Sequence, residues 1–105
     1  MSNFLLITSG GVMPKTEEEQ AAIMKAWGDW FKVLGEHLVD GPNMTGPGVK
    51  TIMNDGSVKD GSDGTMATGY LIIEADSSDQ ALELAMGRPT LDGGNLTMYE
   101  IMSGM

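Results

Sequence analysis

The chain has 105 residues, which is enough for one domain (residues 1–105) with a single hydrophobic core and too few for two. Its 15 acidic and 6 basic residues give a formal net charge of −9, which argues against nucleic acid or an anionic membrane surface as a partner, because both would repel it. The absence of cysteine excludes disulfides, thiol catalysis and thiolate metal sites.

The N-terminal sequence MSNFLLITSGG contains one short apolar run with no basic residue before it. This pattern fits neither a signal peptide nor a membrane span, so we expect a cytoplasmic protein. Phe4 to Thr8 lacks alternation, which favours a strand that is buried on both faces. Ser9-Gly10-Gly11 and Pro14 then predict a structural turn, because they match neither phosphate-binding glycine pattern.

The clearest buried face belongs to a helix that starts after Thr16. Ile23, Trp27, Trp30 and Leu34 follow one another at spacings of four, three and four, which is one stripe of an α-helix. The two tryptophans could line a ligand pocket, but their shared stripe favours packing in the core for both.

Local signals define both ends of this helix. Thr16 and Glu19 form a capping box, and Gly35 is a natural stop. Gly28 lies inside the helix, where glycine costs about 1 kcal/mol relative to alanine. We expect this glycine to allow close approach of a neighbouring backbone.

The rest of the chain reads as strands and one shorter helix. After a short extended piece, Asp40-Gly41-Pro42 predicts a turn, and Asp55-Gly56 predicts a hairpin between 49–54 and 57–60. Ser77 or Ser78 can cap a helix that runs through Met86, and Gln80 would complete a capping box on Ser77. The expected strands on either side of this helix are 68–75 and 95–102.

This order of elements predicts an α+β fold: a ferredoxin-like antiparallel sheet of four main strands with both helices on one face. In the strand 68–75, Leu71 and Ile73 point to one face while Tyr70 and Ile72 point to the other. The second face would leave apolar groups in water, and a two-fold homodimer, sheet against sheet, would cover them.

With these elements in place, the chain resembles the YCII-related proteins, close to the branch named for a DGPF signature. The resemblance rests on FLLI, MKAWGDWF, LVDGP, VKDG before TGYLII, and RPTLDGGNLTMYEI. It implies a dimeric α+β barrel in which two ferredoxin-like sheets face each other around a pocket. Of the signature itself, Asp60 and Gly61 are present, while Ser62 and Asp63 replace its Pro and Phe.

A second departure concerns the family's catalytic residues. Some YCII-like members are thought to use a His–Asp pair, whose positions fall here on Met24 and Val33. Neither side chain can accept a proton. A further acidic residue of the family is replaced by Arg88, so the resemblance carries no acid–base apparatus to this chain.

His37 is the only histidine and therefore the one candidate for proton transfer near neutral pH. Alternation would turn it toward the side of Tyr70 and Glu74, a workable acid–base set, although a solvent-exposed histidine beside a strand explains it as well. One histidine without clustered carboxylates predicts no metal site. Arg88 could hold a carboxylate or could simply be a charge at a helix C-terminus.

Three functions fit these observations. The first is a small dimeric protein that binds an aromatic or carboxylate-bearing metabolite without a cofactor, between facing sheets. The second is a cofactor-independent isomerase or dehydrohalogenase that uses His37, and the third is a structural dimer with a filled interface. For the first, we expect the ligand on the sheet face away from the helices, in contact with His37 and Tyr70, with Arg88 at the rim.

Overall fold

The computed structural model describes residues 2–10, 15–46, 48–64, 66–89 and 94–102. Its elements in chain order are β1 (Ser2–Gly10), α1 (Glu17–Leu34), the single 3-10 turn η1 (Gly35–His37), β2 (Leu38–Met44), β3 (Lys50–Ile52), β4 (Val58–Asp60), β5 (Ala67–Ala75), α2 (Ser78–Met86) and β6 (Gly94–Ile101). Among these residues, neither helix is both long and apolar enough to cross a membrane.

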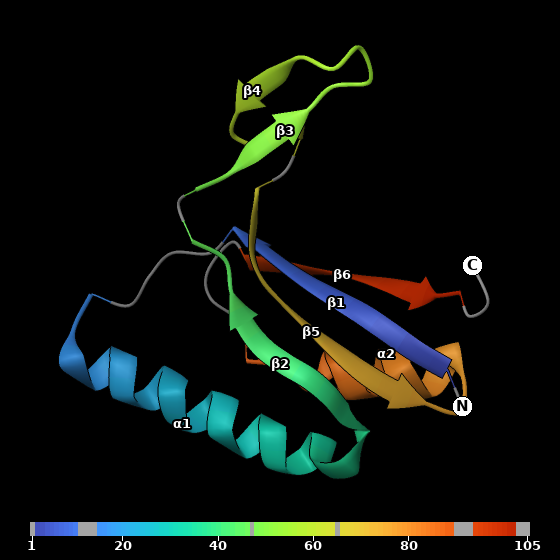
Figure 1. The fold of residues 1–105 in the computed structure, drawn as a ribbon. Helices are drawn as coiled ribbons and strands as arrows, with labels where there is room; N and C mark the ends of the chain where they lie inside the picture. The colour runs from blue at the N-terminus through green and yellow to red at the C-terminus, as the bar shows by residue number, and fades with distance from the viewer. Residues whose placement is uncertain (1, 11–14, 47, 65, 90–93, 103–105) are drawn as a thin grey trace.

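Four strands form the main sheet in the order β2-β5-β1-β6, and every neighbouring pair is antiparallel. Helix α1 connects β1 to β2, and α2 connects β5 to β6. Both helices contribute buried side chains to one core, so they cover the same face of the sheet, and Figure 1 views the sheet with α2 behind it. The predicted ferredoxin-like α+β fold is confirmed.

The core lies between the helices and the two central strands. The register places Phe4 opposite Ile73 and Leu6 opposite Leu71, and all four side chains are buried on the helix side. Leu34 completes this core from α1. Burial of these apolar groups on one face is what mainly fixes the register, because a slip of one residue would point all of them to the opposite face of the sheet.

Both predicted caps form. The N–H of Glu19 donates to the Thr16 hydroxyl at 3.1 Å, and the Glu19 carboxylate accepts from the N–H of Lys15, one residue earlier than in the standard box. The same arrangement starts α2 at Ser77. Helix α1 ends at Gly35, which has a φ of 52°.

The prediction of a turn at Asp40-Gly41-Pro42 is wrong, because these residues belong to strand β2. The pairing of β2 with β5 has two register shifts in this region. Gly41 has a φ of 102°, and a Cβ there would lie 3.0 Å from Leu71 Cβ and 3.1 Å from the Tyr70 carbonyl oxygen. The glycine therefore permits a bulged edge strand to pass close to its neighbour, where the sequence pattern indicates a turn.

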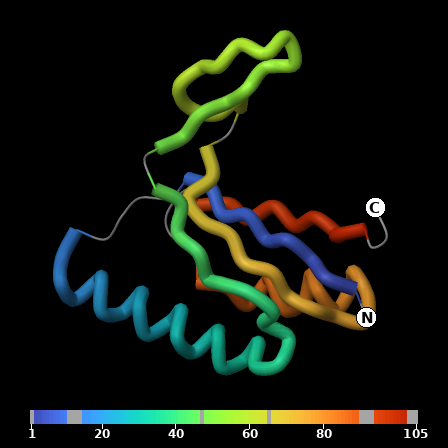
Figure 2. The backbone as a smooth tube through the Cα atoms, in the orientation of Figure 1, coloured from blue at the N-terminus to red at the C-terminus, as the bar shows by residue number. Residues whose placement is uncertain are grey.

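The predicted hairpin at Asp55-Gly56 is confirmed as a separate two-stranded sheet of β3 and β4. Both the hydroxyl and the N–H of Ser57 donate to the Asp55 carboxylate, which lowers the pKa of this acid below its usual value. Figure 2 shows the hairpin standing away from the main sheet.

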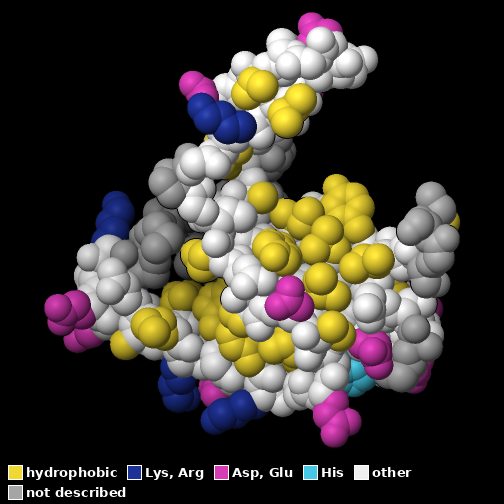
Figure 3. All heavy atoms as spheres, viewed as in Figure 1, with side chains coloured by type: hydrophobic (Ala, Val, Ile, Leu, Met, Phe, Trp, Pro, Cys, Tyr) yellow, Lys and Arg dark blue, Asp and Glu magenta, His cyan; other side chains and the backbone are white. Residues whose placement is uncertain are grey.

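The second face of the main sheet carries apolar side chains. Its residues alternate with those of the core, and Leu5 on β1 pairs with Ile72 on β5 and with Tyr99 on β6. Tyr99 is 53% exposed, and Ile101 and Tyr70 also lie partly in solvent. Figure 3 shows hydrophobic side chains gathered over this face, which we call the open face.

Candidate functional site: an aromatic pocket beside α1

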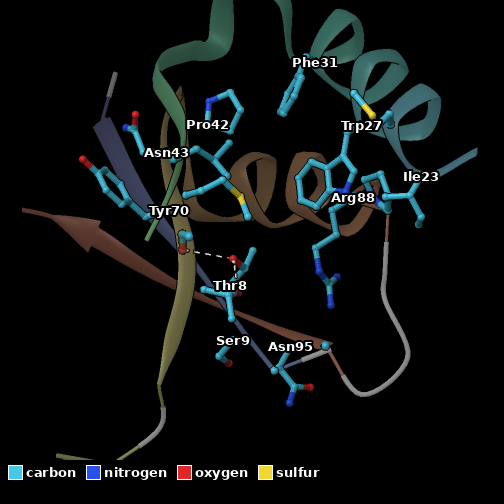
Figure 4. Close-up of a pocket in the computed structure, with 18 of the residues that line it drawn as sticks. Thr8, Ser9, Ile23, Trp27, Phe31, Pro42, Asn43, Tyr70, Arg88 and Asn95 are labelled. Carbon is cyan, nitrogen blue, oxygen red and sulfur yellow. Dashed lines mark hydrogen bonds between the residues drawn. The ribbon is translucent and has the colours of Figure 1, made fainter. Parts of the chain in front are cut away.

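A pocket of about 560 Å³ lies between the N-terminal part of α1 and the helix-covered side of the sheet. Its lining comes from β1, α1, β2, β5, the two residues Arg88 and Pro89 after α2, and the start of β6 (Figure 4). The lining residues are Thr8, Ser9, Gly10, Ile23, Met24, Trp27, Gly28, Phe31, Pro42, Asn43, Met44, Thr68, Gly69, Tyr70, Leu71, Arg88, Pro89, Gly94 and Asn95.

The way α1 packs on the sheet creates this space. Its fully buried side chains, Trp30 and Leu34, both belong to the C-terminal half of the helix. Ile23 and Trp27, from the same stripe, are only half-buried and line the pocket. The helix is therefore held to the sheet at its C-terminal end, and its apolar stripe continues into the pocket.

Aromatic rings form the wall on the helix side. Trp27 meets Trp30 edge to face, with ring centroids 5.4 Å apart and planes at 70°, and lies 5.7 Å from the ring of Phe31. Figure 4 shows Trp27 and Phe31 pointing into the space that Pro42 borders from β2. The prediction that both tryptophans are core residues is correct for Trp30 and only partly correct for Trp27, which packs against the core and also lines the pocket.

Among the described lining residues, Arg88 alone carries a charge. Arg88, the only arginine of the sequence, follows α2, and Figure 4 shows its guanidinium reaching into the pocket. It forms no ion pair with another residue of the described part of the chain. Across the pocket, the Thr8 hydroxyl lies 3.2 Å from the Gly69 carbonyl oxygen and 3.1 Å from the Thr68 hydroxyl. The pocket thus combines an apolar wall with a guanidinium and a hydroxyl.

Gly28 has a different role from the one expected. A Cβ at this position would have no described atom within 4 Å outside its own helix neighbourhood, so no backbone of another described element approaches it closely. Instead, Gly28 lines the pocket beside Trp27 and Phe31. The expectation of close packing at this glycine is therefore wrong. A glycine inside a helix, between aromatic residues in the sequence, marks the pocket wall instead.

The structure separates the three predicted site residues. Arg88 and Tyr70 line the same pocket, but Figure 4 shows the Tyr70 side chain pointing away from the aromatic wall. His37 belongs to η1 and is not a lining residue. Its Nδ1–H donates to the Glu74 carbonyl oxygen at 2.7 Å, near the opposite end of β5 from the pocket. This bond fixes the tautomer of a neutral His37.

Carboxylate and histidine side chains do not gather into a metal site in the described parts of the chain. The pocket lining itself, within the same residues, has threonine, serine, asparagine and tyrosine as its neutral polar types. The chemistry that these groups support is hydrogen bonding and charge pairing with a bound molecule.

Comparison with family models gives no match, and comparison with curated proteins gives none either. Among solved structures, the chain is similar to a 5-chloro-2-hydroxyhydroquinone dehydrochlorinase from Burkholderia phenoliruptrix in complex with 2,5-dihydroxybenzoquinone. The two share 18% sequence identity over 90% of each chain, with a TM-score of 0.48. At this distance, the neighbour says nothing about the activity of this chain.

Proposed function

We propose that this chain is a small YCII-like protein that forms a homodimer and binds a small aromatic or carboxylate-bearing metabolite. The observation that carries the proposal is the aromatic-walled pocket with the side chain of Arg88 inside it. Its volume, about 560 Å³, falls within the range of small-molecule sites, which are mostly apolar with a few polar groups that fix orientation.

Arg88 gives the pocket its preference for an acid. A guanidinium is always charged and can form two parallel hydrogen bonds with one carboxylate. In apolar surroundings such a pair is stronger than in water. The net charge of −9 slows the approach of an anion, so we expect the preference to appear in affinity rather than in association rate.

The dimer is proposed from the open face. Leu5, Ile72 and Tyr99 lie side by side on it, and monomeric proteins rarely leave such a patch in water. A two-fold contact would place the same patch of each copy against the other. In this arrangement His37 and Tyr70 would lie near the interface, and a ligand in contact with both stays a prediction.

The alternative function is a cofactor-independent isomerase or dehydrohalogenase that uses His37. Such an enzyme needs a proton acceptor within hydrogen-bond reach of its substrate. The described lining of the pocket contains no histidine and no carboxylate, and His37 lies outside it. The pocket beside α1 therefore favours binding, and the catalytic alternative depends on a second site at the open face.

A fluorescence titration tests the proposal. Benzoate, 2-naphthoate and neutral 2-naphthamide are added to the protein while its tryptophan emission is recorded. We expect saturable quenching by the acids and weaker binding of the amide. The matched control is Met86→Ala, on an exposed side chain outside the pocket, which should bind like the parent. Lack of saturable binding by all three compounds would contradict the proposal.

A further inference from the structure

We infer that Gly28 selects the class of ligand: it leaves a bare stretch of helix backbone against which a flat aromatic ring lies, with the acidic group of the ligand toward Arg88. This inference rests on the proposed function, because it concerns the same pocket. It makes Gly28 the residue that determines specificity for planar aromatic acids.

The first argument is position. Gly28 lies well inside α1, which runs from Glu17 to Leu34, and it lines the pocket beside Trp27 and Phe31. Any other residue would project a side chain into the space that these two rings border. The missing side chain is therefore part of the pocket volume.

The second argument is energetic. Glycine inside a helix destabilises it relative to alanine, since glycine loses more backbone freedom on folding. Close packing of another backbone could offset this loss, but no described atom lies within 4 Å of the place where a Cβ would stand. The φ of Gly28 is not positive either, so its backbone conformation does not require glycine. A ligand in this space would explain why a less stable residue stands there.

The third argument is shape. The rings of Trp27 and Phe31 stand next to each other beside Gly28, with centroids 5.7 Å apart and planes tilted at 41°. These two rings leave no room for a third ring between them, so a flat ligand ring would lie against their pocket-facing surface and over the bare backbone of Gly28, where a thicker, saturated ring would fit less well. Aromatic rings prefer these offset or edge contacts with one another. With Arg88 as the described cation of the pocket, the ligand that fits best is a planar aromatic acid.

The test uses Gly28→Ala, Gly28→Leu and the stability control Ala22→Gly, at an exposed position of the same helix. Without ligand, we expect Gly28→Ala to raise the Tm by about 4–8 °C, because alanine is the better helix former and meets nothing. In binding experiments, Gly28→Ala should weaken the affinity for 2-naphthoate about 10-fold or more and the affinity for benzoate by a smaller factor. Gly28→Leu should remove binding of both acids.

The double variant Gly28→Ala/Ala22→Gly separates stability from binding. We expect its Tm to return close to that of the parent while 2-naphthoate binding stays weak. In the parent, cyclohexanecarboxylate should bind at least several-fold more weakly than benzoate, since the two acids carry the same charge and differ in planarity.

Each contrary result has a distinct meaning. Parent-like binding by Gly28→Leu would overturn the inference and leave the proposed pocket function intact. A lower Tm for Gly28→Ala would show that glycine is needed for the fold, which also overturns it. If the parent binds none of the acids, the proposed function fails, and this inference fails with it.

Discussion

The indole Nε1–H of Trp30 donates a 3.0 Å hydrogen bond to the carbonyl oxygen of Leu84. This bond joins α1 to α2. Trp30 itself is buried, with 3% of its surface exposed. Trp27, one turn earlier on the same stripe, lines the pocket instead. Trp30 therefore belongs to the core, while Trp27 packs against the core and also borders the pocket.

Replacement of Trp30 by alanine should destabilise the protein by about 3–5 kcal/mol, because it leaves a large cavity in the core. Trp30→Phe keeps most of the ring volume but loses the hydrogen bond to Leu84. Beyond the effect of the changed packing, we expect this loss to cost about 1 kcal/mol, because the Leu84 carbonyl still accepts from the N–H of Gly87. Urea denaturation measures both. A Trp30→Ala variant with parental stability would contradict the assignment of Trp30 to the core.

Trp27→Phe should leave the fold nearly unchanged and remove most of the ligand-induced quenching of tryptophan emission. The reason is that Trp27 lies in the pocket wall, while Trp30 is enclosed in the core and keeps its emission. Titration of both variants with 2-naphthoate gives the comparison. If quenching persists in Trp27→Phe and disappears in Trp30→Phe, the ligand site lies elsewhere.

Arg88→Met should weaken the binding of 2-naphthoate by about 10-fold or more, because a hydrogen bond to a charged group contributes about 1.5–3 kcal/mol. Binding of neutral 2-naphthamide should change much less. Arg88→Lys keeps the charge without the planar fork and should fall between the two. Isothermal titration measures these affinities, and equal losses for acid and amide would argue that Arg88 only shapes the pocket.

Tyr99→Asp should weaken or abolish the proposed homodimer, because it places a charge beside Leu5 in the apolar patch of the open face. Light scattering coupled to size exclusion gives the mass directly: twice 11.1 kDa for the parent and 11.1 kDa for the variant. Met86→Asp adds the same charge on α2, at a side chain that is 71% exposed, and should remain dimeric. A parent that is monomeric at all concentrations would reject the dimer without affecting the pocket.

Gly41→Ala should lower the melting temperature clearly. The residue has a φ of 102°, and the added Cβ would lie about 3.0 Å from Leu71 Cβ, so both strain and overlap oppose it. We expect a loss of about 1–3 kcal/mol. Thermal unfolding followed by circular dichroism tests this, with Gly46→Ala as the control, since a Cβ at Gly46 meets no described atom.

Local chemistry in the sequence was enough for most of the fold. The stripe from Ile23 to Leu34 defined α1, the caps at Thr16 and Ser77 defined where the helices start, and Asp55-Gly56 defined the hairpin. These signals depend on hydrogen bonds and periodicity within a few residues, which is why a single sequence reveals them. The order of the elements then led to the ferredoxin-like sheet.

Tertiary structure alone decided where β2 runs and where the pocket lies. Gly41-Pro42 has the composition of a turn, and only pairing with β5 makes it strand. Trp27 and Trp30 are equivalent in the helical pattern, but α1 buries its side chains fully only toward its C-terminal end, so one enters the core and the other borders a cavity. Arg88 and Trp27 lie 61 positions apart in the sequence, and only the packing of the helices on the sheet brings them to the same pocket. The shape of a cavity depends on how a helix lies on a sheet, and contacts between distant residues set that arrangement.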